Sequence, residues 1–181
     1  MSDETLGAPE YSQNMLFTDG LPSVDPNVGY RGTSAALACG ITYRQLDYWD
    51  RTGLVQPTVQ TASGSGTQRL YAFRDILVLK LVKRLLDTGV SLQQIRIAVD
   101  QLRAAGINDL AAITLMSDGS RVYLCTTQDE VMDLLGRGQG VFGIAVGRVL
   151  REVEASLVNI KETQLDTVDE LSARRQGRKV S

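Results

Sequence analysis

The sequence contains no histidine and only two cysteines among its 181 residues. The absence of histidine removes the imidazole that most serine and cysteine hydrolases use as a general base, and it removes the commonest transition-metal ligand. Cys39 and Cys125 lie too far apart in the sequence for a zinc module, and two cysteines do not make a disulfide framework. We therefore expect two buried free thiols, no metal, no cofactor and no enzymatic activity.

Long hydrophobic runs are also missing, as is any basic residue before Arg31. The longest aliphatic stretch, residues 76–79, is closed by Lys80, whereas a membrane-spanning helix needs about 20 apolar residues. A secretory signal peptide needs a positively charged start. We expect a cytoplasmic protein that does not interact with membranes.

Charge is distributed unevenly along a chain whose formal net charge is −2. Residues 1–30 carry five acidic residues and no lysine or arginine, whereas residues 31–103 carry ten lysines or arginines against five aspartates. Residues 104–160 are acidic again, and residues 172–181 form a short basic tail. A basic segment between acidic neighbours suggests a module that binds a polyanion, although this excess of positive charge is modest by itself.

Residues 1–30 are rich in Ser, Asp, Gly, Pro and Asn and show no apolar period, so we expect an acidic disordered tail. Within this tail, Gln13 is followed by Leu16 and Phe17, which resembles the short peptide that docks into bacterial DNA sliding clamps. A match of this length also arises by chance, and both interpretations stay open.

Two short helices are predicted at the start of the basic segment, over residues 34–39 and 43–52. Thr33 and Thr42 are suited to cap the two helices, and a glycine follows each of them. Two short helices joined by a tight turn that contains glycine are typical of a helix-turn-helix.

The next residues predict a wing and two further helices. Residues 56–68 have no helical character and lead into a short alternating strand at 69–71, which indicates a β-hairpin with a flexible tip. A strongly apolar helix over 73–88 is expected to form the buried centre of the domain. Ser91 then caps a helix that ends at Gly106.

The character of the sequence changes after Gly106. The elements predicted there are, in order, strands over 113–116 and 121–125, a helix over 128–135, a strand over 140–146 and a long helix over 147–171. Residues 138–143 spell GxGxxG. A dinucleotide site requires this motif to leave a strand and open a helix, whereas here it leaves a helix and enters a strand, so we interpret its glycines as a tight connection.

Apolar residues recur every seven positions in the last predicted helix. This repeat favours a helix that pairs with a second copy of the chain, although a helix packed on its own domain needs the same stripe. We predict a dimer contact through Leu150, Val153, Leu157 and Ile160.

Residues 41–55, ITYRQLDYWDRTGLV, resemble the recognition-helix signature of the MerR family of transcriptional regulators. That signature runs hydrophobic, Ser/Thr, x, Arg, x, Leu-Arg-Tyr-Tyr-Glu, x, x, Gly-Leu-Leu. The similarity continues through residues 68–71, QRLY, where the family usually has Tyr-Arg-x-Tyr, and through residues 88–95, TGVSLQQI. It covers residues 32–103 in unbroken order, about two-fifths of the chain.

The resemblance implies a mainly α fold with a winged helix-turn-helix DNA-binding domain at 31–105. A small α+β unit at 106–171 follows, which ends in a long helix and serves dimerisation or regulation. The resemblance also implies that eight residues contact double-stranded DNA. They are Thr42, Tyr43 and Arg44 at the major-groove end of the recognition helix, Tyr48 and Arg51 on the DNA backbone, and Gln68, Arg69 and Tyr71 on the wing. Arginine reads guanine edges or clamps phosphates, and tyrosine hydroxyls donate to phosphates, so the residue types suit these roles.

Asp47, Trp49 and Gln68 are among the departures from the family pattern. Asp47 stands where the family has an arginine that contacts phosphate, so it cannot make that contact and instead is placed to orient Arg44 or Arg51, one turn away on either side. Trp49 replaces the second tyrosine, and Gln68 the first wing tyrosine. These changes resemble an actinobacterial branch of the family and argue against a standard operator.

We therefore predict a nucleoid-associated, sequence-specific transcriptional regulator that acts as a homodimer on near-palindromic promoter DNA and affects RNA polymerase indirectly. Promoter distortion, as in MerR-type activation, and repression by occlusion both stay open. The alternative is a DNA architectural protein or an excisionase-like recombination accessory factor, because excisionases share the winged fold.

Overall fold

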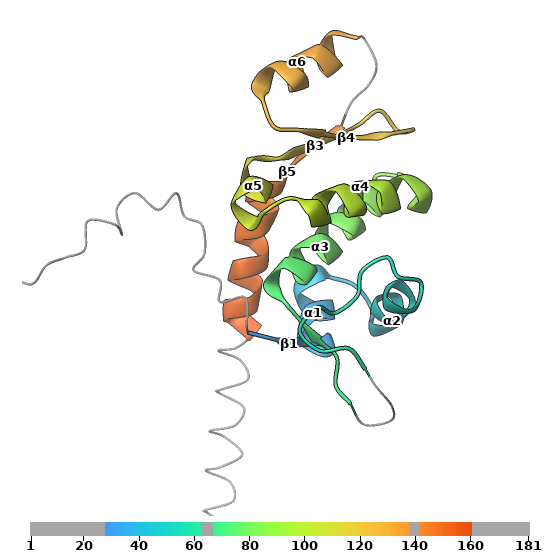
Figure 1. The fold of residues 1–181 in the computed structure, drawn as a ribbon, viewed down its shortest axis with the longest axis vertical. Coiled ribbons are helices and arrows are strands. Elements are labelled where there is room, and N and C mark those ends of the chain that lie inside the picture. The colour runs from blue at the N-terminus through green and yellow to red at the C-terminus, as the bar shows by residue number, and fades with distance from the viewer. Residues whose placement is uncertain (1–27, 63–66, 138–141, 161–181) are drawn as a thin grey trace, which may run out of the picture.

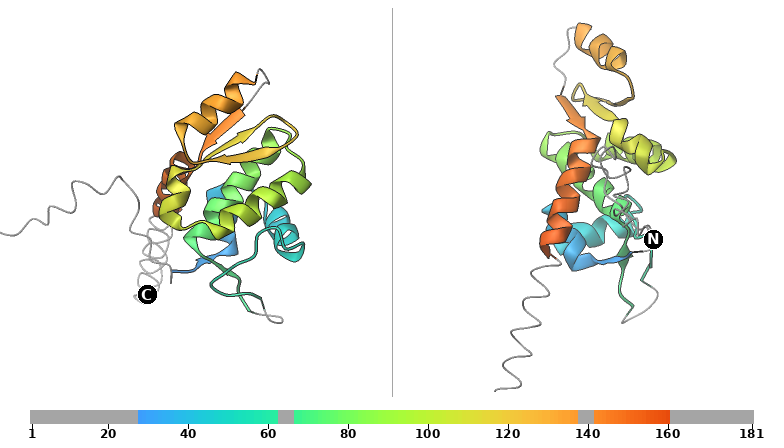
Figure 2. Two further views of the ribbon diagram at one scale, coloured as in Figure 1. Left: turned by 45° about the horizontal axis from the view of Figure 1, so that its top comes forward. Right: turned by 90° about the vertical axis from the view of Figure 1, so that its left-hand side faces the viewer.

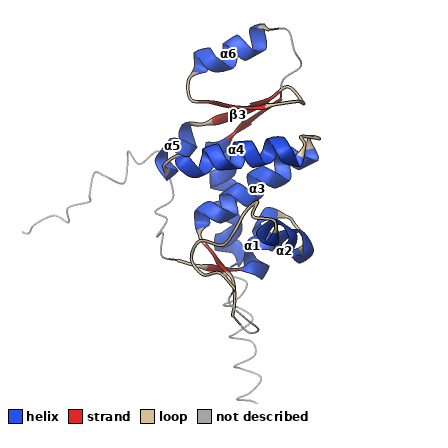
Figure 3. Ribbon diagram, turned by 45° about the vertical axis from the view of Figure 1, so that its right-hand side comes forward, coloured by secondary structure: helices blue, strands red, loops and turns tan. Residues whose placement is uncertain are grey.

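The computed structural model describes residues 28–62, 67–137 and 142–160. This part of the chain is mainly helical, with two small antiparallel sheets at opposite ends of the molecule (Figure 1, Figure 3). The predicted fold class is confirmed. The predicted peptide at Leu16 and Phe17 and the basic tail at 172–181 lie outside the described residues. Among the described residues, no helix is long and apolar enough to cross a membrane.

The winged half of the chain contains the predicted helix-turn-helix. In order, its elements are β1 (Tyr30–Arg31), α1 (Gly32–Cys39), α2 (Tyr43–Arg51), β2 (Leu70–Tyr71), α3 (Phe73–Asp87) and α4 (Leu92–Ala104). The turn between α1 and α2 is made at Gly40, whose φ of 69° lies in the left-handed region that glycine adopts without strain. α2 begins with the predicted cap at Thr42, whose hydroxyl accepts from the Gln45 N–H while the Gln45 side chain accepts from the Thr42 N–H.

The wing is anchored by a strand pairing that the sequence analysis missed. β1 pairs with β2 in an antiparallel two-stranded sheet. On the other side of β2, Gln60 and Leu70 exchange two backbone hydrogen bonds of 3.1 and 2.9 Å, which confirms the base of the predicted hairpin. Residues 63–66, in the predicted tip, lie outside the described residues. Because α1 follows β1 directly, it begins at Gly32 without a side-chain cap, and not after Thr33 as predicted.

α3 lies at the centre of a continuous hydrophobic core. Ile76, Leu77 and Leu79 are fully buried because apolar side chains cover most of the helix circumference. α1 and α4 pack against α3. The helix at 146–160 runs along the same core, as the two views of Figure 2 show. The core continues without interruption across the predicted boundary at residues 105 and 106.

The C-terminal half adds a small sheet and three helices. In order, its elements are α5 (Ile107–Ala112), β3 (Thr114–Ser117), β4 (Val122–Cys125), α6 (Gln128–Gly136), β5 (Phe142–Ala145) and the helix at 146–160. β3 is the central strand in the order β4-β3-β5, and both pairings are antiparallel. α5 was not predicted. Residues 138–141 of the GxGxxG motif lie outside the described residues, and its last two residues belong to β5, in a sheet that contains no parallel pair.

The stripe predicted to form the dimer contact lies inside the chain's own core. Leu150, Val153 and Leu157 are each at most 3% exposed, and Ile160 is half-buried against the same cluster. The Arg84 guanidinium of α3 also forms an ion pair with a Glu152 carboxylate oxygen at 2.5 Å. Side chains buried within one chain cannot form an apolar contact with a second chain. Burial of Leu150, Val153 and Leu157 therefore contradicts the predicted dimer contact through these three residues, and the stripe is that of a helix packed on its own domain. A dimer contact through the half-buried Ile160 stays a prediction.

Candidate nucleic-acid interface

α2 turns a basic and aromatic face outward. Its opposite face is fixed in the core through Leu46 and Trp49, which are 0% and 3% exposed. The exposed members of the predicted contact set on this helix and its cap are Thr42, Tyr43, Arg44, Tyr48 and Arg51. Tyr43 and Tyr48 each expose more than half of their surface. Two exposed tyrosines beside two exposed arginines give a surface suited to polyanionic backbones and base edges.

Most cations of the basic segment are engaged within the fold. Arg74 donates to the Leu102 and Arg103 carbonyls at the end of α4, at 2.8 and 2.7 Å. Arg96 and Arg103 donate to the carbonyls of Thr52 and Leu54, just after α2. Five further cations also have partners, namely Arg51, Arg69, Lys80, Lys83 and Arg84.

Two cations of this segment have no such partner. Within the described residues, the Arg31 and Arg44 side chains make no hydrogen bond or ion pair. They lie at the N-terminal ends of α1 and α2. The unpaired cations among the described residues of this segment thus belong to the starts of the two helices of the helix-turn-helix.

A surface pocket of about 590 Å³ lies between α2 and the wing. Its lining comes from β1, the start of α1, α2 and the wing, through Arg31, Gly32, Thr33, Tyr43, Asp47, Ala62, Thr67, Gln68 and Arg69. Gly32 permits a close approach, because a Cβ there would lie 3.1 Å from the Tyr43 ring. The fold thus brings together the predicted residues Tyr43, Gln68 and Arg69. Arg31 and Thr33 join them through the β1–β2 pairing, which no sequence signal indicated.

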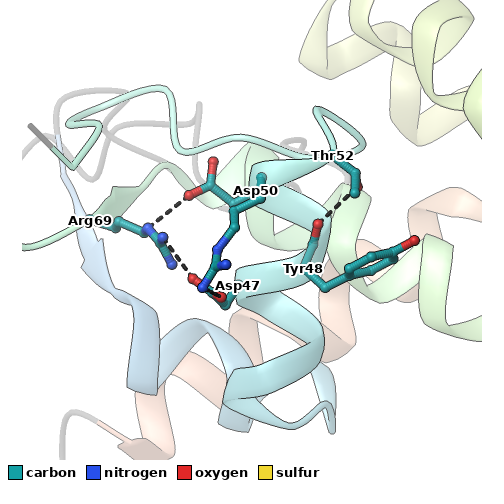
Figure 4. Close-up of polar contacts among 6 residues, drawn as sticks. Asp47, Tyr48, Asp50, Thr52 and Arg69 are labelled. Atoms are coloured by element: carbon teal, nitrogen blue, oxygen red, sulfur yellow. Dashed lines mark hydrogen bonds and ion pairs between the residues drawn. The ribbon is translucent and has the colours of Figure 1, made fainter.

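Arg69 reaches from the wing to two carboxylates of α2 (Figure 4). Its Nη2 donates to Asp47 Oδ1 at 2.8 Å, and its Nε lies 2.7 Å from Asp50 Oδ2 in an ion pair that lacks hydrogen-bond alignment. Asp47 also binds Arg51 at 2.5 Å, which was one of the two partners considered from the sequence. The hydrogen bond from Arg69 is the main reason that the pKa of Asp47 lies below its usual range.

Tyr71 belongs to the core. Its side chain is 0% exposed, and its hydroxyl has no hydrogen-bond partner among the described residues. Burial is the main cause that raises the pKa of this phenol above its ordinary value. A buried hydroxyl cannot donate to a DNA phosphate, so the predicted contact of Tyr71 with DNA is wrong.

Both cysteines are buried free thiols, as predicted. Burial raises the pKa of Cys39 to about 12, and it raises the pKa of Cys125 as well. No group of three or more Cys, Asp or Glu side chains in the described part of the chain is arranged to hold a metal ion.

Comparison with known proteins places this arrangement in a family. Residues 30–102 match the model of the MerR HTH family regulatory proteins. An uncharacterized HTH-type transcriptional regulator of Mycobacterium bovis is 57% identical over 161 residues, which covers 85% of this chain and 72% of the relative. The chain belongs to the MerR family. A counterpart in Mycobacterium tuberculosis gives the same identity and coverage.

More distant similarities reach other transcriptional regulators. The HTH-type transcriptional regulator HmrR of Sinorhizobium medicae is 30% identical over 83 residues, covering 45% of this chain and 54% of that protein. A crystal structure of a MerR-family transcriptional regulator from Bacillus cereus aligns with 82% of this chain and 84% of its own, at 19% identity and a TM-score of 0.38.

Proposed function

We propose that this MerR-family protein binds near-palindromic promoter DNA as a homodimer and regulates transcription there, with RNA polymerase affected only through the DNA. The outward face of α2 carries the proposal, because its tyrosines and arginines are exposed while the opposite face is fixed in the core. Thr42, Tyr43 and Arg44 lie at the N-terminal end of α2, the end that recognition helices direct toward base edges. Tyr48 and Arg51 then face the phosphates.

We infer the homodimer from the two equivalent half-sites that near-palindromic DNA presents. One α2 and its wing read one half-site, and a two-fold symmetric protein reads two half-sites about 34–36 Å apart. The contact between the two copies then lies outside the buried stripe of the helix at 146–160. A dimer that holds two recognition helices at a fixed separation can twist or bend a promoter whose spacing does not match.

Fluorescence anisotropy with a fragment of the protein's own promoter and a scrambled fragment, over a series of salt concentrations, tests this function. Specific regulators prefer their sites by roughly 10³ or more, which is the result expected here. Equal and steeply salt-dependent binding to both fragments would favour the architectural alternative.

The Arg44→Ala substitution tests the reading role of α2. If Arg44 contacts a base, its loss should cost about 1–3 kcal/mol of binding free energy for each half-site and relax preference at one base step in each. Arg151→Ala is the matched control, since it removes the same charge from an exposed position on the helix at 146–160. Equal losses in the two variants would mean that α2 does not read the DNA.

A further inference from the structure

The guanidinium of Arg69 is occupied on two sides by the recognition helix. A planar guanidinium carries five N–H donors in a fixed fork, which allows it to bind two carboxylates at once. Arg69 uses this geometry on Asp47 and Asp50, which lie one turn apart on α2, at 2.8 and 2.7 Å. We call these three residues the Arg69 cluster. Figure 4 shows the side chain spanning the gap between the wing and α2.

The Arg69 cluster is shielded from solvent. The side chains of Arg69 and Asp50 are only 16% and 15% exposed, and that of Asp47 is 25% exposed. Arg51 shares Asp47 yet has a side chain that is 74% exposed. Partly buried ion pairs are screened less by salt than exposed ones, so the contacts of Arg69 persist where the contact of Arg51 weakens.

Arg69 lies directly before β2, so its contacts with α2 also position the wing. The next residue, Leu70, makes both backbone hydrogen bonds to Gln60 that close the hairpin, and it belongs to β2, which pairs with β1. Holding Arg69 therefore holds the stem of the hairpin at a set distance from α2. A wing that follows the DNA backbone beside a recognition helix needs such a fixed distance.

The charges in the cluster oppose a direct contact between Arg69 and phosphate. A phosphate that captured Arg69 would leave Asp50 without its ion pair and Asp47 with only its exposed partner Arg51. Two such carboxylates beside the DNA backbone would repel it. Asp47 stands where the family pattern has arginine, so this second carboxylate is a departure of the present chain.

We propose that Arg69 is a positioning residue that fixes the wing to the recognition helix through Asp47 and Asp50, in place of the phosphate contact expected from its place in the wing motif. The effect of this positioning on DNA binding rests on the proposed function. The contact of Arg69 with Asp47 and Asp50 is present without DNA. Two experiments separate these parts.

The first experiment measures amide hydrogen exchange in the free, full-length protein. Arg69→Met keeps the length of the side chain and removes its charge, so the Gln60 and Leu70 amides should exchange faster by about tenfold or more while the α3 amides keep their protection. Arg51→Met is the matched control, because it also removes a partner of Asp47 but does not touch the wing. Arg69→Lys should restore part of the protection, since an ammonium is a point charge without the planar fork.

Unchanged exchange at Gln60 and Leu70 in Arg69→Met would overturn the proposal. If Arg69→Met loses protection throughout α3, the smaller change Asp47→Asn replaces it. That variant removes one charged partner of Arg69 and should also accelerate exchange at the two wing amides. No acceleration there would overturn the proposal equally.

The second experiment measures the salt dependence of promoter binding. Each phosphate contact contributes about 0.9 to the slope of log K against log salt concentration. Arg69→Met should weaken binding and leave the slope as in the unsubstituted protein. Arg51→Met should reduce the slope by about 1.8, because the homodimer loses one phosphate contact in each copy. A reduction of about 1.8 in Arg69→Met, one contact in each copy, would assign Arg69 to a phosphate and overturn the proposal. If the unsubstituted protein binds no DNA, the proposed function fails while the exchange experiment still decides whether Arg69 positions the wing.

Discussion

Whether a wing side chain packs against the domain or faces solvent depends on the side of the extended chain from which it projects. Arg69 and Tyr71 lie two positions apart, so in an extended segment their side chains point to the same side. In this protein that side faces the domain, where Arg69 meets the acids of α2 and Tyr71 enters the core. Gln68, just before them, is exposed. The family motif gives the residue types but not this orientation, and for that reason the expected contact of Tyr71 was wrong.

Cys39 is expected to be chemically inert in the folded protein. Its side chain is 1% exposed, its Sγ–H donates to the Ile76 carbonyl at 3.3 Å, and burial raises its pKa to about 12. Because the thiolate is the nucleophile and a raised pKa keeps the thiol protonated at neutral pH, iodoacetamide should label Cys39 more than about tenfold more slowly than in urea-unfolded chain. Mass spectrometry of labelled peptides measures both rates. Rapid labelling of the folded protein would contradict this assignment.

Among the helices and strands, those with a local start signal were predicted best. Thr42 and Thr127 form complete capping boxes with Gln45 and Glu130, and α2 and α6 begin where these residues predict. Gly119, with φ of 87°, likewise marks the hairpin between β3 and β4. β1 and α5 were missed, since the two residues of β1 are too few for a period and the strand is defined only by its partner β2.

The two predicted caps of the helix-turn-helix provide a direct test of helix capping. Thr42 accepts a hydrogen bond from the Gln45 N–H, whereas α1 has no side-chain cap and Thr33 lies within it. Thr42→Ala should lower the free energy of unfolding by about 1 kcal/mol, and Thr33→Ala should change it by less than about 0.5 kcal/mol. Urea unfolding followed by circular dichroism gives both values. A larger loss of stability in Thr33→Ala than in Thr42→Ala would contradict the role of Thr42 as the stabilising cap.

At the scale of the whole molecule, one core joins the winged domain to the C-terminal half. The cluster runs from Ala35 in α1 through α3 to Leu157, and the Arg84–Glu152 ion pair bridges the same contact. A seven-residue apolar repeat predicts that a helix buries one face, but it does not predict which element or chain covers that face. The repeat therefore predicted the buried residues correctly and their partner wrongly.

Leu157 and its neighbour Val158 separate these two meanings of the stripe. Leu157 is 3% exposed and Val158 is 49% exposed. Leu157→Ala should lower the free energy of unfolding by about 2–5 kcal/mol, and Val158→Ala by less than about 0.5 kcal/mol. Light scattering should give the same molar mass for Leu157→Ala as for the unsubstituted protein. A variant that unfolds normally but dissociates into lighter species would reinstate Leu157 as a contact between copies.

The strand β1 also decides how short a working DNA-binding fragment can be. A fragment that begins at residue 32 would keep α2 whole. It would lack Tyr30 and Arg31, which pair with β2, and Arg31 is also the N-cap residue of α1. The family match itself starts at residue 30, and Gly29 just before it passes so close to the wing that a Cβ there would lie 2.9 Å from Leu70 Cβ. The wing is thus built from two stretches separated by the whole helix-turn-helix, so a fragment begun at the first helix would carry an intact reading helix beside an unfinished wing.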